Sequence, residues 1–509
     1  MPTYLSPGVF VEEKPAGSAP IEGVGTAVAA FVGLALKGPL NQATLVSNWK
    51  QFVDVFGDFT SDGYLAHAVY GYFLNGGGNC YVVRIGANGH PAPVAEGVIN
   101  APAAEGKAPA RYVVRALDPG RDGGAISVEV ADASDGDDDA FKLVVRRGGK
   151  IEEQHDNLSA SGKGKQSATT AVKAASQLID LQEASNAPAV RPLNGTTALA
   201  APTPAPARLE PSDYVGDVAD RTGFGGLETI DEITMVCVPD VMAALQKGAI
   251  DLEGVKAVQL AMIAHCELMA DRIAIIDPPP DLNPQAILKW RQDEAGYDSR
   301  YAALYWPWVK VFDPASNANV FVPPSGHVAG IWGRNDDSRG VHKAPANEVM
   351  RGVVAVASDL TSREQELLNP VGINCVRTFA GRGIRVWGAR TLSSDPEWRY
   401  VNVRRLFNYL EESILNGTQW VVFEPNDYAL WARVRRTITA FLTNEWRKGA
   451  LFGLTPDEAF YVKCDNETNP PEVVDAGQLV CEIGVAPVKP AEFVIFRLAQ
   501  FSGGAALTE

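Results

Sequence analysis

Strand-like and helix-like segments alternate through the middle of the chain, and this alternation limits the possible folds more than any other feature. Short apolar runs typical of buried strands span residues 233–238, 273–276 and 301–312. Residues 253–270 and 284–295 between them have the apolar spacing of helices. Strands joined by helices of this length pair in parallel, with the helices covering the sheet. The sequence therefore predicts an α/β unit built on a parallel sheet.

Segments on both sides of this unit extend the prediction. Before it, the order strand, helix, helix, strand is indicated by residues 26–36, 49–56, 64–74 and 80–85. After it, helices at 362–368, 401–415 and 427–448, a strand at 420–423 and a β-rich tail are predicted.

Two stretches rich in Pro, Gly and Ala, residues 86–110 and 187–207, indicate extended and semi-rigid connectors. Short alternating runs between them predict hairpin strands at 112–117, 126–131 and 141–146, and a helix is predicted near 168–181. We therefore expect a β-rich insertion with one helix.

Length and charge exclude several classes of protein. A chain of 509 residues corresponds to about three or four folded units. A net charge of -16 with 46% hydrophobic residues is typical of a globular chain and argues against a duplex nucleic-acid binder. The amino terminus lacks the features of a secretory signal, and the uncharged stretch at 23–36 is too short to span a membrane. We expect assembly in the cytoplasm without membrane insertion.

Catalytic and metal-binding motifs are not found in the sequence. The six cysteines lie far apart along the chain, and the six histidines lack ligand spacing, so buried thiols and no metal or cofactor are predicted. Asp240 and Asp277 follow predicted parallel strands, where α/β enzymes place reactive groups. Turn and capping roles explain an Asp in that position equally well.

The helix predicted at 427–448 has an apolar stripe and an excess of positive charge on a strongly acidic chain. Such a surface is either a solvated face or a docking surface for an acidic partner. Its basic residues are Arg433, Arg435, Arg436, Arg447 and Lys448.

Strand-like segments near both termini have no local partner. Val9, Phe10 and Val11 lie between turn-forming segments, and residues 492–498 form a strong strand signal before a Gly-rich tail. An unpaired strand is an aggregation hazard unless something covers its edge. The two termini either pair as edge strands within their own subunit or join a sheet elsewhere.

Linked motifs near both ends closely resemble the tail sheath proteins of contractile phages and related contractile injection systems. At the amino terminus, residues 4–13 look like the opening of that family. The other matching segments are residues 382–392, 398–406, Glu411, 423–426, Phe441, Leu442, Trp446, 449–453, 486–487 and 490–493.

The resemblance implies a mixed α/β fold whose sheath core is formed by both ends of the chain, around a subtilisin-like central domain. It divides the chain into an arm strand at 1–20, the first part of the inner α/β core at 21–95, a β-rich outer insertion with flanking linkers at 96–212, the central domain at 213–370, a C-terminal core domain with a tube-facing helix at 371–488, and a C-terminal arm strand with its tail at 489–509.

The resemblance also implies a structural function without enzymatic activity or cofactor. Identical subunits would polymerise helically around an inner tube by exchanging terminal strands, and would contract from a metastable extended state. The exchanged residues would be Val9, Phe10, Val11, Phe493, Val494, Ile495 and Phe496, and the basic residues of 427–448 would face the tube. Further partners would be baseplate and tail-terminator or cap proteins, in a phage tail or an injection particle.

Two other classes stay open from the residues alone. A cytoplasmic subtilisin-like α/β hydrolase would need a nucleophile with a base in reach. A β-rich binding or fibre protein would have a stable monomer with free ends.

Overall fold

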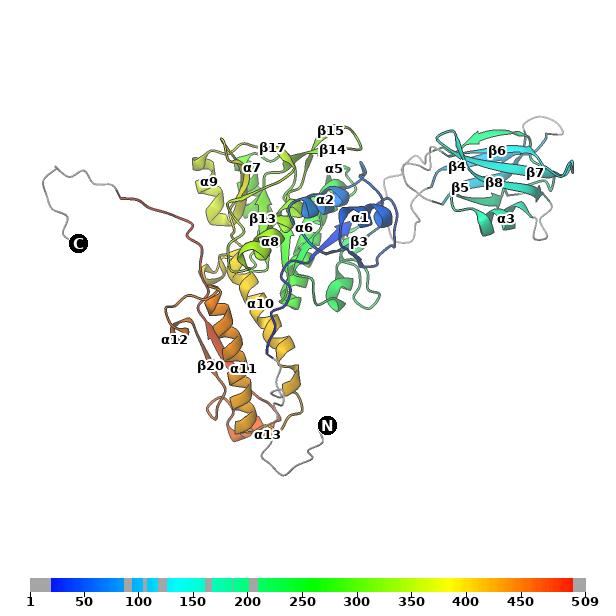
Figure 1. Ribbon diagram of the computed structural model, residues 1–509. Coiled ribbons are helices and arrows are strands. Elements are labelled where there is room, and N and C mark those ends of the chain that lie inside the picture. The colour runs from blue at the N-terminus through cyan, green and yellow to red at the C-terminus, as the bar shows by residue number, and fades with distance from the viewer. Residues whose placement is uncertain are drawn as a thin grey trace, which may run out of the picture.

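A computed structural model of the protein describes residues 20–86, 94–103, 108–117, 126–160, 167–185, 187–200 and 209–497. Its body is built on one nine-stranded sheet with helices on both faces (Figure 1). The strands lie in the spatial order β16 (Glu348–Val349), β19 (Gly383–Trp387), β18 (Ile373–Phe379), β13 (Ala302–Trp306), β12 (Ile273–Ile276), β11 (Met235–Cys237), β1 (Ala29–Gly33), β3 (Cys80–Arg84) and β2 (Thr44–Val46).

The predicted parallel sheet is confirmed. The six strands from β18 to β3 in this order pair in parallel, and antiparallel pairs occur only at the two margins. Successive residues of each central strand point to opposite faces, so Ala30 and Val32 pack in one core and Ala29 and Phe31 in the other. Because both faces are covered, the central strands β1, β11, β12 and β13 are apolar throughout rather than alternating.

Two groups of helices cover the sheet. One face carries α1 (Trp49–Phe56), α2 (Leu65–Leu74) and α8 (Ser325–Arg339). The other carries α4 (Pro211–Val215), α5 (Asp240–Gln246), α6 (Leu252–Met269), α7 (Pro284–Lys289) and α9 (Ser362–Leu368). The predicted helices at 49–56 and 362–368 are confirmed residue for residue, because Asn48 and Thr361 cap them with side-chain hydrogen bonds.

The single strand predicted at 301–312 is wrong. It is split into β13 and β14 (Val309–Asp313), which belong to different sheets. Pro307 lies between them and has no N–H to donate to a ladder. β14 forms a small antiparallel sheet with β15 (Ala318–Val322) and β17 (Val353–Val356).

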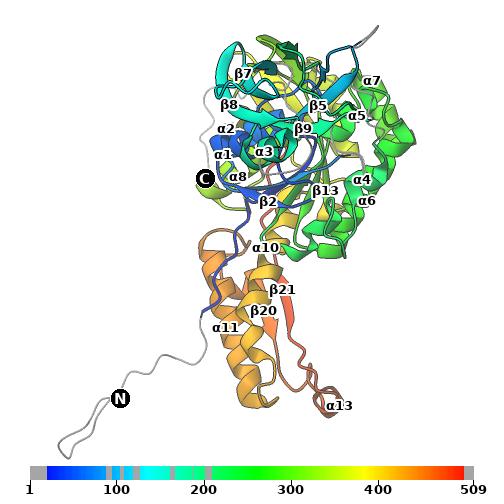
Figure 2. The same ribbon diagram turned by 90° about the vertical axis from the view of Figure 1, so that its right-hand side faces the viewer.

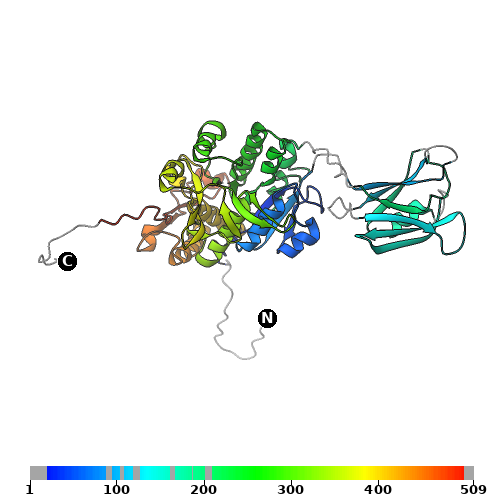
Figure 3. The ribbon, with the colours of Figure 1, turned by 90° about the horizontal axis from the view of Figure 1, so that it is seen from above.

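The insertion is a separate β-rich unit with its own core, as predicted (Figure 3). One sheet contains β10 (Gly195–Ala198), β6 (Ile126–Asp132), β7 (Ala140–Arg147) and β8 (Lys150–Ser159), and the other contains β4 (Glu96–Asn100), β5 (Ala110–Ala116) and β9 (Ile179–Glu183).

Two predictions about the insertion need correction. The Pro- and Ala-rich stretches are not only connectors, because each contributes a strand, β4 or β10. The helix predicted at 168–181 ends earlier, as α3 (Ala168–Ala175), because the next segment pairs with β5 as strand β9.

The C-terminal unit projects from the body as a long helix pair with a hairpin beside it (Figure 2). It consists of α10 (Val401–Gly417), α11 (Tyr428–Arg447), α12 (Pro456–Ala459), β20 (Phe460–Lys463), α13 (Pro471–Asp475) and β21 (Glu482–Val485). The strand predicted at 420–423 is wrong: a short 3-10 turn and an exposed loop occupy these residues.

Both ends of the described chain meet this unit, which agrees with a core built from both chain ends. Ile21 is buried in the core of the helix pair, and the Val24 N–H donates to Ser413 Oγ of α10 at 3.1 Å. In the described residues no helix is both long and apolar enough to cross a membrane. The predicted subtilisin-like topology and the domain boundaries stay predictions.

Candidate functional site

The helix pair of the C-terminal unit is held by the apolar stripe that the sequence indicated. The α11 residues of this stripe are at most 5% exposed and pack against α10 and the hairpin. Asp427 caps the helix by accepting a hydrogen bond from Leu430 N at 2.8 Å. The buried residues are Leu430, Trp431, Val434, Ile438, Phe441 and Leu442.

The five basic residues of this helix do not form one uniform surface. Arg433 pairs with Glu424 at 2.6 Å and lies over the Trp420 ring, and Arg435 donates to the Cys464 carbonyl at 3.1 Å. Lys448 pairs with Glu445 at 2.7 Å.

Arg436 and Arg447 are the free cations of this group. Both are exposed, and neither has an ion pair or side-chain hydrogen bond to another described residue. Eleven residues correspond to just over three full helical turns, so the two side chains share one outward face, about 16 Å apart along the axis. These two arginines are therefore the best placed to contact another molecule.

The β20–β21 hairpin has no third strand among the described residues. It pairs from Phe460↔Val485 to Lys463↔Glu482 and leaves two short outer edges. Beside it, a largely apolar groove of about 410 Å³ runs between α10, α11 and β21. Phe407, Leu410, Leu442, Ile483 and Val485 line it. A strand edge next to an apolar groove can accept an extended peptide.

The predicted arm residues fall into two groups. Val9, Phe10 and Val11 lie outside the described residues. Phe493, Val494, Ile495 and Phe496 are described, and they are 67% to 84% exposed. The described part of the predicted strand, residues 492–497, pairs with no other described segment of the subunit and runs away from the body (Figure 1).

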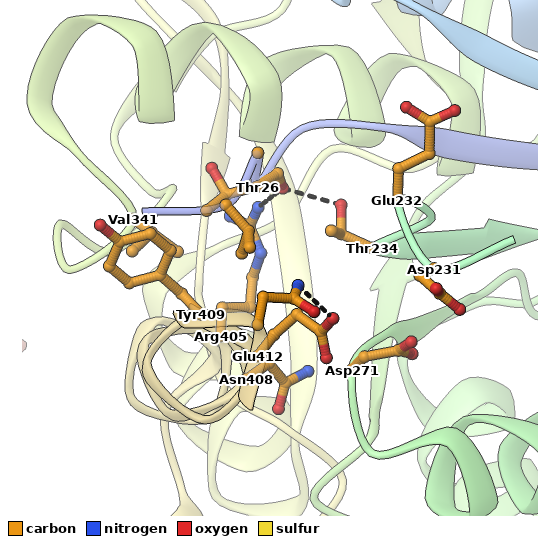
Figure 4. A pocket seen from close by; sticks show the side chains of 13 residues that line it. Thr26, Asp231, Glu232, Thr234, Asp271, Val341, Arg405, Asn408, Tyr409 and Glu412 are labelled. Carbon is orange, nitrogen blue, oxygen red and sulfur yellow. Dashed lines mark hydrogen bonds between the residues drawn. The ribbon is translucent and has the colours of Figure 1, made fainter. Parts of the chain in front are cut away.

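A polar pocket of about 180 Å³ lies where the N-terminal segment crosses between the sheet and α10 (Figure 4). Thr234 Oγ1 donates to the Thr26 carbonyl at 2.8 Å on one wall. Burial, and then the nearby charges of Asp271 and Asp231, raise the pKa of Glu412 on the other wall. The Thr26 hydroxyl donates to Asp336 Oδ2 at 2.7 Å, and that carboxylate is paired with Arg405, so we interpret the pocket as a joint between units.

Asp240 and Asp277, the sequence candidates for chemistry, are both buried and act as acceptors for backbone N–H groups. Asp240 accepts from Leu34, Tyr64 and Leu65, while burial raises its pKa to about 6. Asp277 accepts from Ser325 N at 3.0 Å, and burial raises its pKa to about 7. These contacts fix loops and helix starts, which is the capping role that the sequence left open.

Ser325 and His327 near Asp277 form the nearest approach to a hydrolase arrangement. Ser325 is fully buried, so no substrate carbonyl can reach its hydroxyl. His327 is two positions along the same helix, and residues at that spacing do not face each other. Burial also lowers the pKa of His327 to about 4. The geometry gives the hydrolase alternative no support.

Two cysteines that the sequence separates are neighbours in the fold. Cys464 follows β20 and Cys481 precedes β21, which makes them the next cross-strand pair of the hairpin. Spacing along the chain could not show this, because 16 residues including α13 separate them. Within the described ranges, no group of three or more His, Cys, Asp or Glu side chains could hold a metal ion.

Comparison with known proteins identifies the family. The profile of the phage tail sheath protein central domain matches residues 226–392, and that of the phage tail sheath C-terminal domain matches residues 393–501. The tail sheath protein of Vibrio phage KVP40 is 28% identical over 292 residues, which are 53% of this chain and 41% of that protein. The chain spans 41% to 62% of the length of the curated relatives it matches.

Two solved structures share the fold over nearly the whole chain. The helical sheath of the anti-feeding prophage in its contracted state has a TM-score of 0.59 at 24% identity and covers 98% of this chain and 100% of that one. The contracted PVC sheath complex of an extracellular contractile injection system has a TM-score of 0.58 at 23% identity, with 98% and 99% covered. The two profiles together match more than half of the residues, and the chain belongs to the phage tail sheath family.

Proposed function

We propose that this protein is the structural sheath subunit of a contractile phage tail or injection system, with no enzymatic activity. Identical subunits polymerise helically around an inner tube and contract from a metastable extended state. One surface of a subunit meets a different surface of the next, so the assembly need not close and grows as a helix. The observation that carries the proposal is the exposed apolar segment Phe493–Phe496, which has no strand partner among the described residues of its own subunit.

The arms link neighbouring subunits by adding strands to a sheet. The outer edges of β20 and β21 and the apolar groove beside β21 are the receiving surface. Val9, Phe10 and Val11 of the other terminus belong to the same exchange. The arms act as tethers that keep subunits connected while their bodies move.

Apolar burial must supply most of the free energy of this exchange. Fixing each arm residue costs about 1–2 kcal/mol, while a backbone hydrogen bond contributes a net of about 1 kcal/mol. Burying each Phe, Ile or Val side chain contributes about 1.5–3 kcal/mol. Two of the four side chains of residues 493–496 on the covered face would then contribute about 3–6 kcal/mol, which makes up the deficit.

The outward face of α11 contacts the inner tube, and Arg436 and Arg447 are its free cations. Exposed ion pairs contribute only about 0–1 kcal/mol each, so contacts of this kind hold a sheath and still release it on triggering. Baseplate and cap proteins at the two ends of the assembly are the remaining partners. Whether the particle works inside or outside the producing cell depends on its payload and release.

Truncation of the arms tests the proposal. The full chain should form long hollow helical assemblies in negative-stain images, and deletion of residues 1–20 or 493–509 should abolish them while leaving the circular dichroism of the body unchanged. The matched control is Ile151→Ser, which changes an exposed apolar side chain of the insertion. Intact tubes from both truncations would refute the exchange.

Charge reversal tests the tube contact. Arg436→Glu with Arg447→Glu should weaken co-assembly with the inner tube protein and leave sheath-only polymers intact. The control is Lys289→Glu. Lys289 is an exposed cation at the end of α7 in the body, and it has no ion pair to a described residue. Equal tube binding by both variants would exclude the α11 face.

A further inference from the structure

The carboxylate of Glu492 accepts four hydrogen bonds from three side chains just before the chain leaves the body. Arg390 donates twice, from Nε to Oε1 at 2.8 Å and from Nη2 to Oε2 at 2.7 Å. Asn369 Nδ2 donates to Oε1 at 2.7 Å, and Tyr400 OH donates to Oε2 at 3.0 Å. A paired Arg–carboxylate contact of this kind is strong and fixes orientation as well as position.

The three donors come from three separate parts of the body. Asn369 ends α9, Arg390 follows β19 and Tyr400 precedes α10. Partial burial alone would raise the pKa of Glu492, but the hydrogen bonds from these donors outweigh it, so that the pKa is lowered and the carboxylate is held ionised.

Arg390 is itself tied to the central sheet. Its backbone N–H donates to Asn374 Oδ1 at 2.7 Å, and Asn374 Nδ2 donates back to the Arg390 carbonyl at 2.7 Å. Asn374 belongs to β18, is fully buried, and also donates to the Leu304 carbonyl of β13 at 3.1 Å. The Glu492 side chain is therefore connected to the middle of the nine-stranded sheet through two polar side chains.

Contacts with the parent subunit stop at this residue in the described chain. Before it, Val488 is held on both sides, because its carbonyl accepts from Asn402 Nδ2 at 3.1 Å and its N–H donates to Ala450 O at 3.3 Å. After it, Phe493 is already 72% exposed and Phe496 is 84% exposed. The transition from a fixed to a free chain occurs within one residue.

We propose that Glu492 is the mechanical anchor of the C-terminal arm, a positioning residue that transfers tension from the exchanged strand to the central sheet of its own subunit. This inference rests on the proposed function, because it assigns a role to the root of the arm whose exchange was proposed there. A pull on residues 493–497 reaches β18 through Arg390 and Asn374. It bypasses the β20–β21 hairpin, which is engaged in receiving another subunit's strand.

The bypass has a physical reason. Without the anchor, tension on the arm would act along residues 486–491, which continue directly from β21. Pulling there would first load the hydrogen bonds of Val488 to Asn402 and Ala450, and would then peel β21 from β20, whose four-residue ladder breaks one hydrogen bond at a time. With the anchor, tension on the arm passes through Glu492 to the central sheet, so it does not act on the β20–β21 hairpin of the same subunit.

Glu492→Gln is the principal test, because it keeps the shape of the side chain and removes its charge. Arg390→Lys is the second variant, since it keeps the charge but loses the two-pronged contact. The control is Glu472→Gln on α13, where the exposed carboxylate has no side-chain hydrogen bond to a described residue. All three proteins should retain the circular dichroism spectrum of the unchanged chain.

Two readouts separate the anchor from the proposed function. In the unassembled subunit, hydrogen exchange of residues 486–491, read at the hydrogen-bonded amides of Ala486 and Val488, should be about tenfold faster in both anchor variants and unchanged in the control. In assembled tubes, subunit loss after dilution should be about tenfold faster for Glu492→Gln, because a loosened root lets the arm slip.

Each outcome has a distinct meaning. Absence of tubes from the unchanged protein would refute the proposed function, while the exchange measurement would still test the anchor. Unchanged exchange at residues 486–491 would overturn the anchor, even where assembly is lost, because the effect would then come from a contact with another subunit. Faster exchange with tubes as durable as those of the control would show a local contact that bears no load, and would overturn the proposal as well.

Discussion

Replacing Asp336 with asparagine should strongly destabilise the joint between the body and the C-terminal unit. Asp336 lies on α8 and Arg405 on α10, and both side chains are 3% exposed. Arg405 Nη1 donates to Oδ1 at 3.0 Å and Nη2 to Oδ2 at 2.6 Å. Arg405 Nη2 also donates to the Thr26 carbonyl at 2.8 Å, and the guanidinium lies 4.8 Å from the centre of the Trp332 ring.

The expected size follows from this burial. Removing one partner of a shielded ion pair leaves an uncompensated charge, which costs about 3–5 kcal/mol. Asp336→Asn and Arg405→Met should each show this loss. The double variant Asp336→Leu with Arg405→Met removes both charges and should cost no more than about 2 kcal/mol, far less than the sum of the single changes.

Hydrogen exchange of α8 and α10 is the suitable assay, because a chain of several units does not unfold in a single two-state transition. The control is Asp54→Asn, which breaks an exposed pair with Lys50 and should cost less than about 1 kcal/mol. If the buried single variants also cost less than about 1 kcal/mol, or if the double variant equals their sum, the argument from burial is wrong.

Other features of the structure give three further predictions. A Cβ at Gly330 would overlap the backbone of α2, so Gly330→Ala should lower the melting temperature, whereas Gly78→Ala, which meets no atom within 4 Å, should not. Oxidised glutathione should slowly convert the two thiols of Cys464 and Cys481 into a disulfide with release of two reduced glutathiones; peptide mass mapping should detect it, and Cys481→Ser should prevent it. Because the pKa of Glu492 lies below its ordinary 4.5 in the folded chain, its ionised contacts stabilise the arm root at neutral pH, and the protection of the amides of residues 486–491, taken relative to the intrinsic exchange rate at each pH, should fall as the pH drops below that value.

The spacing of apolar residues predicted the layered body well, because the signals that start, orient and end each helix or strand lie within that segment. The helix at 49–56 has its cap, its apolar face and its end within ten residues, and none of these depends on distant contacts. The strand predicted at 420–423 failed because strand propensity there had no partner strand. Residues 420–423 favour a strand, but Asp427 begins α11 only a few residues later, so the chain must turn there.

The contacts to which the proposed assembly assigns a role could not be predicted from the sequence, because they join residues that lie far apart along the chain. Arg390 and Glu492 both lay in segments that resemble the family, yet no spacing rule brings residues 102 positions apart into contact. The apolar stripe of α11 was predictable from its period, but which arginines stay free was not. Arg435 is engaged only because the hairpin after α12 returns its Cys464 carbonyl to that side of the helix.

The C-terminal arm and residues 420–423 both have a strand signal, but they differ in the contacts that the described subunit gives their side chains. At residues 420–423 the strand signal conflicts with the observed turn, but one of the side chains is still covered within the chain. The guanidinium of Arg433 lies 4.4 Å from the centre of the Trp420 ring. At Phe493–Phe496 four consecutive apolar side chains keep a strong strand signal, stay largely exposed, and have no strand partner in the part of the subunit that the structure describes. In a sequence whose local signals otherwise agree with its fold, such a conflict marks a functional segment. Under the proposed function, the structure that satisfies this segment is the polymer, and the isolated subunit displays one unsatisfied end of it.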